Sequence, residues 1–230
     1  MANICTTRIV VVDTLENLEK INKAIESHEV QENTDKGWGG NILRALGAEV
    51  NEHVCYGFIE YPGEIKPAKL DDDFESALKD YCKRFYNFDY PTQENGSTVM
   101  PHVIDAARYF FCLGKGIENL YELHLDCEDR WMRGEFVECL QEMFPGAAIY
   151  WMSEEPGCQY WRTNDVDGKY FPDRWVVITD EDWEYFTTEE DALEYLKENF
   201  DIDSLDDIEK YNENNEDGNT VTCYECEEEF

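Results

Sequence analysis

Residues Ala147–Thr188 read "AAIYWMSEEPGCQYWRTNDVDGKYFPDRWVVITDEDWEYFTT". Aromatic and β-branched residues gather in four short runs within this stretch, at Ala147–Glu155, Cys158–Asn164, Arg174–Asp180 and Trp183–Thr188. Turn-forming residues separate the runs, at Glu155–Gly157, Asp165–Gly168 and Asp180–Asp182. Runs of this length and composition, bounded by Gly, Pro and Asp, are typical of β-strands. The stretch therefore predicts four consecutive antiparallel strands.

Upstream of this stretch, predicted strands alternate with predicted helices. Strands are expected at Asn3–Val12, at His53–Ile65 with a break at Pro62-Gly63, and at Asn119–Cys127. Helical spacing of apolar residues predicts helices that cover Asp13–His28, Asn41–Gly47, Asp71–Phe88, Pro101–Gly114 and Phe136–Met143. Strands and helices that alternate before an antiparallel run indicate an α+β fold.

The third and fourth helices have apolar stripes that we expect to be buried. The stripe of the third helix consists of Phe74, Ala77, Leu78, Tyr81, Cys82 and Phe85. That of the fourth consists of Val103, Ala106, Ala107, Phe110 and Phe111. No linker rich in Pro, Ser or Gly divides the chain. We therefore expect a single α+β domain over residues 1–200, with a helical insertion at about 66–118, and an acidic C-terminal extension over 201–230.

Two segments carry a resemblance to a known family. One is the start, "MANICTTRIVVV", in which Asn3 and Cys5 lead into a strand. The other is "RGEFVECLQEMFPGAAIYWMSEEPGCQYW" (Arg133–Trp161), in which a helix ends at Phe-Pro and a strand ends in Glu-Glu-Pro-Gly. Both segments resemble the YubB-type ferredoxin-like family of phage and plasmid proteins. The resemblance implies a ferredoxin-like core, a mixed or antiparallel sheet with helices on one face, and a mobile-element origin. It implies no catalytic residues.

Negative charge dominates the composition. The 230 residues include 53 Asp and Glu against 19 Lys and Arg, a formal net charge of −34. The charge is uneven, because residues 116–230 have 34 acidic and 7 basic residues and residues 180–230 alone have 21 and 2. Hydrophobic residues still make up 42% of the chain, which is too many for an acidic disordered protein. The sequence predicts a folded body with an acidic C-terminal half.

This charge excludes several classes of partner. Binding to a nucleic-acid backbone normally requires Lys and Arg to displace counterions, so direct nucleic-acid binding is not expected. An anionic membrane surface is disfavoured for the same reason. No apolar run approaches the ~18 residues of a membrane span. No basic leader or cleavage site follows the start, and nine scattered cysteines suit a reducing compartment, so we expect a cytoplasmic protein.

Motifs for metals and catalysis are weak. Cys223 and Cys226 form one C-x-x-C, whereas a structural zinc site needs four ligands. A calcium loop centred on Gly168 has Asp165 and Asp167 but places Arg174 where a bidentate Glu is required. Carboxylate pairs that could flank a cleft are Asp126, Glu128, Asp129, Glu154 and Glu155. Such pairs are common in a chain with 53 acids, so we expect no cofactor and no enzymatic activity.

The best candidate for function is the acidic face of the predicted helix Thr188–Phe200, for which Thr188 and Asp191 form a capping box. Leu193, Leu196 and Phe200 are expected to pack inward. The exposed acids of the face are Glu190, Glu194, Glu198, Asp201, Asp203, Asp206, Asp207 and Glu209. Regularly spaced carboxylates can imitate nucleic-acid phosphates, so the expected partner is the basic surface of a nucleic-acid-binding protein of the defence or restriction type. The alternatives are an acidic structural or housekeeping protein without a specific site, and a metal-binding protein that uses the C-terminal cysteine pair.

Overall fold

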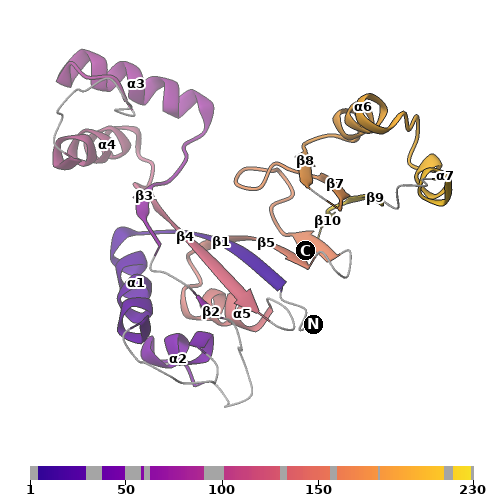
Figure 1. Cartoon of the computed structure of the whole chain (residues 1–230). Helices are drawn as coiled ribbons and strands as arrows, with labels where there is room; N and C mark the ends of the chain where they lie inside the picture. The colour runs from indigo at the N-terminus through magenta and orange to yellow at the C-terminus, as the bar shows by residue number, and fades with distance from the viewer. Residues whose placement is uncertain are drawn as a thin grey trace.

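The computed structural model describes residues 5–29, 38–49, 58–59, 63–90, 101–129, 134–155, 160–180, 182–214 and 220–228. Within these residues the protein is α+β, with helices on one face of a large sheet and a smaller sheet near the other (Figure 1). The predicted α+β class is confirmed.

The larger sheet has the strand order β10-β6-β5-β1-β4-β2, and β3 also pairs with β4. Its strands are β1 (Cys5–Asp13), β2 (Phe58–Ile59), β3 (Ile65–Pro67), β4 (Tyr121–Asp129), β5 (Ala148–Glu155), β6 (Tyr160–Thr163) and β10 (Glu227–Glu228). β1 lies in the centre, antiparallel to both β4 and β5. The pairing of β10 with β6 is parallel, so the sheet is mixed.

One face of this sheet packs against three helices. They are α1 (Leu15–Glu29), α2 (Trp38–Ala45) and α5 (Gly134–Met143). Alternate residues of the central strand, Ile9 and Val11, join Leu18 and Ile21 of α1 and Leu140 of α5 in one buried cluster. Period-2 alternation in the strand and 3.6-residue spacing in the helices place these side chains on facing surfaces. The apolar stripes predicted for α1 and α5 are therefore confirmed.

The second sheet has the order β8-β7-β9. Its strands are β7 (Trp175–Thr179), β8 (Trp183–Phe186) and β9 (Val221–Glu225). All four strands predicted in Ala147–Thr188 exist, but the expected single antiparallel run is wrong. β5 pairs with β6 in the larger sheet, β7 pairs with β8 in the smaller one, and β6 and β7 belong to different sheets.

The loop between β6 and β7 is built around a buried carboxylate. Asp165 accepts hydrogen bonds from the backbone N–H groups of Lys169, Tyr170 and Phe171, at 2.7–3.1 Å. The Gly168 N–H donates to the Asp165 carbonyl at 2.9 Å, and Gly168 has φ +65, a conformation that glycine adopts without a steric penalty. By accepting these hydrogen bonds, the Asp165 carboxylate stabilises the turn through which the chain passes from the larger sheet to the smaller one.

The C-terminal segment contributes to both sheets. β9 pairs with β7 in the smaller sheet, and β10 pairs with β6 in the larger one. Between them, the Cys226 N–H donates to the Arg174 carbonyl at 2.7 Å. The residues expected as an acidic extension thus include two strands, together with the helix α7 (Asp207–Asn214).

A helical hairpin lies between β3 and β4, within the expected insertion. It consists of α3 (Asp72–Tyr86) and α4 (Pro101–Lys115), which form a separate apolar cluster around Leu78, Cys82 and Phe111. The expected stripes are only partly correct, because Phe85 and Phe110 are exposed rather than buried. Two paired helices bury only their mutual interface, and these two rings lie at its margin, lining a shared groove.

Candidate functional site: the acidic C-terminal face

The candidate face begins with α6 (Glu189–Phe200). Thr188 is its N-cap, and the Thr188 side chain accepts a hydrogen bond from the Asp191 N–H at 3.2 Å. The Thr188 hydroxyl also donates to the Asp191 carboxylate at 2.6 Å, so the two residues predicted as a cap do interact. Leu196 is fully buried, whereas Leu193 and Phe200 are only half-buried against the smaller sheet. Packing on one side leaves the opposite side of α6 to solvent.

The eight carboxylates predicted for this face are nearly all exposed. The exposed ones are Glu190, Glu194, Glu198, Asp201, Asp203, Asp206 and Glu209. Asp207 is half-buried at the start of α7, where the Ser204 hydroxyl donates to its carboxylate at 2.6 Å. Asp207 thus stabilises the start of α7, which makes it less available to a partner.

Asp201 does not continue the row of glutamates along α6. It lies beyond the last helical residue, with φ 57 in the left-handed region, and its N–H bonds back to the Leu196 and Lys197 carbonyls. The Lys197 ammonium pairs with Asp201 and, at 2.8 Å, with Asp203. The hydrogen bond from Lys197 holds the pKa of Asp201 below its usual range. Two of the eight predicted carboxylates are therefore partly neutralised by a lysine of their own chain.

The other exposed carboxylates of the face lack such compensation. Among the described residues, no ion pair involves Glu190, Glu194 or Glu198 on α6, or Asp206 and Glu209 at α7. Successive glutamates of α6 are four residues apart, about one helical turn or ~6 Å. Like charges at this spacing repel each other. The uncompensated part of the face is thus a row of three glutamates on α6, continued by Asp206 just before α7 and by Glu209 on α7.

A hollow lies beside α7 and the segment that joins it to α6. Its volume is about 620 Å³, and its lining is Asp201, Ile202, Asp203, Asp207, Lys210, Tyr211 and Asn214. The Tyr211 ring packs edge-on against Phe200, with centroids 5.9 Å apart. The three carboxylates of the hollow outnumber Lys210 of the lining and Lys197, which pairs with two of them, so the hollow has a net negative charge. It suits a cationic side chain of a partner better than an anion.

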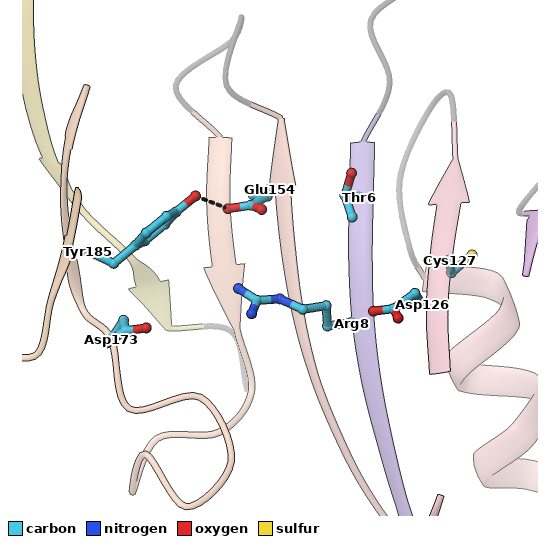
Figure 2. A pocket seen from close by; sticks show the side chains of 7 residues that line it. All are labelled: Thr6, Arg8, Asp126, Cys127, Glu154, Asp173 and Tyr185. Atoms are coloured by element: carbon cyan, nitrogen blue, oxygen red, sulfur yellow. Dashed lines mark hydrogen bonds between the residues drawn. The ribbon is translucent and has the colours of Figure 1, made fainter. Parts of the chain in front are cut away.

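A second hollow lies between the two sheets, on the face of the larger sheet opposite the helices (Figure 2). It has a volume of about 420 Å³ and is lined by Thr6, Arg8, Asp126, Cys127, Glu154, Asp173 and Tyr185. Arg8 reaches from β1 across β5 toward Glu154 and Asp173. The Tyr185 hydroxyl donates to Glu154 at 3.0 Å, and the nearby carboxylate adds to burial in raising the pKa of Tyr185.

The chemistry of this second hollow is mixed. Three carboxylates surround a single guanidinium, and among the described residues Arg8 forms no ion pair. Arg8 instead donates to the Met152 sulfur at 3.7 Å and lies over the Phe171 ring. An excess of carboxylates disfavours an anionic ligand, and the guanidinium disfavours a cation. The structure brings Asp126 of one suggested carboxylate group and Glu154 of the other to the same hollow, a combination that the sequence did not predict. Sequence inspection also missed Arg8, because its neighbours depend on the register of β1 with β4 and β5.

The C-terminal cysteine pair does not converge. Cys223 packs in the cluster beneath α6, whereas Cys226 is buried in the cluster between the two sheets. Burial raises the pKa of Cys223 to about 11 and that of Cys226 to about 12, which disfavours the thiolate that a metal requires. Among the described residues no three His, Cys, Asp or Glu side chains gather as a metal site would need. Asp165, the first acid of the suggested calcium loop, already accepts three backbone hydrogen bonds.

Comparison of the chain with protein-family models, with curated proteins and with solved structures found no match. Within the part of the chain that the structure describes, no helix has both the length and the apolar character that a membrane crossing requires.

Proposed function

We propose that this protein is a non-enzymatic acidic binder, which uses the α6–α7 face to occupy the nucleic-acid-binding surface of another protein. In this proposal the target is a defence or restriction-type protein, the acidic binder belongs to a phage or mobile element, and it acts in the host cytoplasm. The observation that carries the proposal is the row Glu190, Glu194 and Glu198, exposed on a well-packed helix and without ion pairs among the described residues. The row lies in a C-terminal region that is strongly acidic.

The spacing of the glutamates along α6 also supports the proposal. Each strand of B-DNA carries one phosphate per ~3.4 Å of helix axis, and phosphates of the opposite strand widen the range of distances that a basic groove can accept. Carboxylates one helical turn apart, at ~6 Å, fall within that range. A basic groove that binds duplex DNA can therefore engage several glutamates of α6 at once. Long-range attraction between a chain of net charge −34 and a basic surface also accelerates association.

We also propose that the core is ferredoxin-like. The order β5-β1-β4-β2 places β1 between β5 and β4, and β4 between β1 and β2. α1 follows β1, and α5 connects β4 to β5, each on the same face of the sheet. Two crossovers of this kind, each with an antiparallel strand inserted between its two strands, are the split β-α-β arrangement of ferredoxin-like folds. The proposal agrees with the resemblance of the two sequence segments.

The test is inhibition of DNA cleavage by a panel of purified restriction endonucleases, with and without the protein. A face variant replaces Glu190, Glu194, Glu198 and Glu209 by Gln; Asp201 and Asp203 are left intact because they bind Lys197. The matched control replaces Glu49, Glu64, Glu118 and Glu142 by Gln. These four are also exposed and form no ion pair among the described residues, so both variants lose the same charge.

We expect the wild-type protein and the control to inhibit at least one endonuclease with similar potency, and the face variant to be at least tenfold weaker. Raising the salt concentration should weaken wild-type inhibition more than that of the face variant. If both variants lose inhibition equally, the net negative charge of the protein is what matters, and the α6–α7 face has no specific role. If the wild-type protein inhibits none of the enzymes and binds none of them, the proposal fails for this class of target.

A further inference from the structure

The outer surface of the α3–α4 hairpin exposes an unusual set of large apolar side chains. Phe85 is 62% exposed, Tyr109 51%, Phe110 53% and Leu113 63%. Phe85 and Phe110 line one groove of about 370 Å³, together with Tyr81, Phe111, Ala77 and Gly114. The charged residues of this groove are Asp80, Arg84 and Lys115. In Figure 1 the hairpin projects from the sheet at the opposite side from α6 and α7.

Helix geometry explains why these side chains point outward. Ala107 and Phe111 of α4 are buried against Leu78 and Cys82 of α3, and they define the inner face of the hairpin. Leu113 is four residues from Tyr109 and three from Phe110, so it meets both of them on the outer side of α4. Their exposure is therefore a consequence of good packing inside the hairpin and not of an incomplete core.

The exposed area is large enough to matter. At about 200 Å² for a large apolar side chain, the four exposed fractions correspond to roughly 450 Å² of apolar surface. The largest apolar patch of a typical monomeric protein is about 300–600 Å² and is often functional, so this surface ranks among such patches. A stable interface buries about 800 Å² per partner, so the four side chains supply more than half of that area.

Charge indicates which partner fits the patch. The helices α3 and α4 contain five acidic and five basic residues, a net charge of zero, in a chain of net charge −34. Two copies of the chain repel each other over their acidic surfaces, and this hairpin is a surface where that repulsion is small. The groove has charges of both signs, Arg84 and Lys115 beside Asp80, so it is complementary to itself under a two-fold axis.

We infer that the protein forms a homodimer in which the outer face of α3–α4, with Phe85, Tyr109, Phe110 and Leu113, packs against the same face of a second copy. The contact is isologous, so each copy supplies both an apolar ridge and a groove. The result is a four-helix arrangement that leaves both α6–α7 faces free. The inference does not depend on the proposed function, because none of the carboxylates of that face takes part.

Sedimentation of the full chain over a range of concentrations tests the inference. We expect a reversible shift from the 27.0 kDa monomer to a species of twice that mass at micromolar concentration. Leu113→Asp should raise the dissociation constant at least tenfold, since it places a carboxylate in the apolar contact. Because Leu113 is mostly exposed, this change should leave the melting temperature of the monomer unaltered. Val166→Asp is the matched control. Val166 is also exposed, but it lies in the loop between β6 and β7, so this substitution should leave the dimer intact.

The salt dependence separates this dimer from a different self-association. Added salt screens the repulsion between two acidic chains, so an apolar dimer should tighten as salt rises from about 0.05 to 0.5 M. A head-to-tail contact between an acidic face and the basic groove residues would instead weaken. Monomers at all concentrations up to several hundred micromolar in 0.5 M salt would overturn the inference. So would a dimer that Leu113→Asp leaves intact.

Discussion

The guanidinium of Arg108 donates to the carbonyl oxygen of Ala68 at 2.7 Å, and this contact ties α4 to the segment that follows β3. Arg108 is buried, and it also donates to the Asn119 side chain at 3.0 Å and the Tyr90 hydroxyl at 3.1 Å. No carboxylate among the described residues pairs with it. The donors of one side chain therefore hold both ends of the helical insertion against the sheet.

Replacing Arg108 should destabilise the protein strongly. Arg108→Met removes these hydrogen bonds and leaves buried acceptors unsatisfied, each at about 1–3 kcal/mol. We expect the free energy of unfolding in urea to fall by roughly 3–5 kcal/mol, because several hydrogen bonds to one guanidinium are lost together. Arg44→Met is the control, because Arg44 is exposed on α2 and, among the described residues, its side chain donates to Asn41 alone, at the helix surface. A loss below ~1 kcal/mol for Arg108→Met would show that the insertion is held mainly by its apolar contacts.

The surroundings of Glu122 predict how the stability of the protein depends on pH. It is buried on β4, and its carboxylate contacts His124 at 3.0 Å and Lys66 at 3.3 Å. Burial raises the pKa of Glu122, but the hydrogen bond from His124 and the charges of His124 and Lys66 outweigh burial and hold this pKa below its ordinary value of 4.5. A carboxyl group with a depressed folded-state pKa stabilises the protein above its unfolded-state pKa, and the stabilisation is lost as pH falls through the folded-state pKa.

We therefore expect Glu122→Gln to lower the free energy of unfolding at pH 7 by about 1–3 kcal/mol. Below pH ~4.5 the wild-type protein should lose stability more steeply than the variant, so that the two curves approach each other in acid. Urea unfolding at pH intervals from 7 to 3 measures this. Two parallel curves would mean that the carboxylate contributes no pH-dependent stability.

Thr188 should stabilise α6 through its cap. Thr188→Ala removes the acceptor for the Asp191 N–H and should lower the free energy of unfolding by about 1 kcal/mol. The neighbouring Thr187 is exposed and makes no side-chain hydrogen bond among the described residues, so Thr187→Ala should change stability by less than ~0.5 kcal/mol. Thr188→Ser retains the hydroxyl and should recover most of the loss. If Ser at position 188 is as destabilising as Ala, the cap is not the cause.

The buried cysteines should react slowly with alkylating agents. Burial raises the pKa of Cys82 to about 11 and that of Cys226 to about 12. A thiol of pKa 11 is only about one-thousandth ionised at pH 8, and the thiolate is the reactive form. Iodoacetamide at pH 8, followed by peptide mass spectrometry, should modify these two residues at least a hundredfold faster in 8 M urea than in buffer. Rapid modification of the folded protein would show that these residues become accessible by local opening.

Most elements of secondary structure were predictable because their signals are local. The apolar spacing Leu18, Ile21 and Ile25 predicts α1, and all three side chains are buried. The four runs of Ala147–Thr188 are all strands. Their partners were not predictable, because pairing depends on contacts between segments far apart in the chain. Val176 lies opposite Tyr224, for instance, in a strand 48 residues later.

In the candidate face, too, some features were predictable from local sequence and others depend on the tertiary structure. The exposure of Glu190, Glu194 and Glu198 follows from helical periodicity and was predictable. The pairing of Lys197 with Asp203 was not, because it requires the chain to reverse at Asp201 in a left-handed conformation. The half-buried state of Asp207 likewise depends on the start of α7, where Ser204 donates to it.

The sequence by itself determined the α+β class, most of the helices and strands before residue 201, and the concentration of negative charge in the C-terminal half. These properties depend on composition and on periods of two and 3.6 residues, which a single segment displays. Only the tertiary structure decided that the run of four strands divides between two sheets, that β9 and β10 complete them, and that Phe85 and Phe110 face solvent. Sheet membership and burial depend on which surfaces pack together. A face of one element is buried only when a matching face from another part of the chain covers it, so these properties belong to the whole chain.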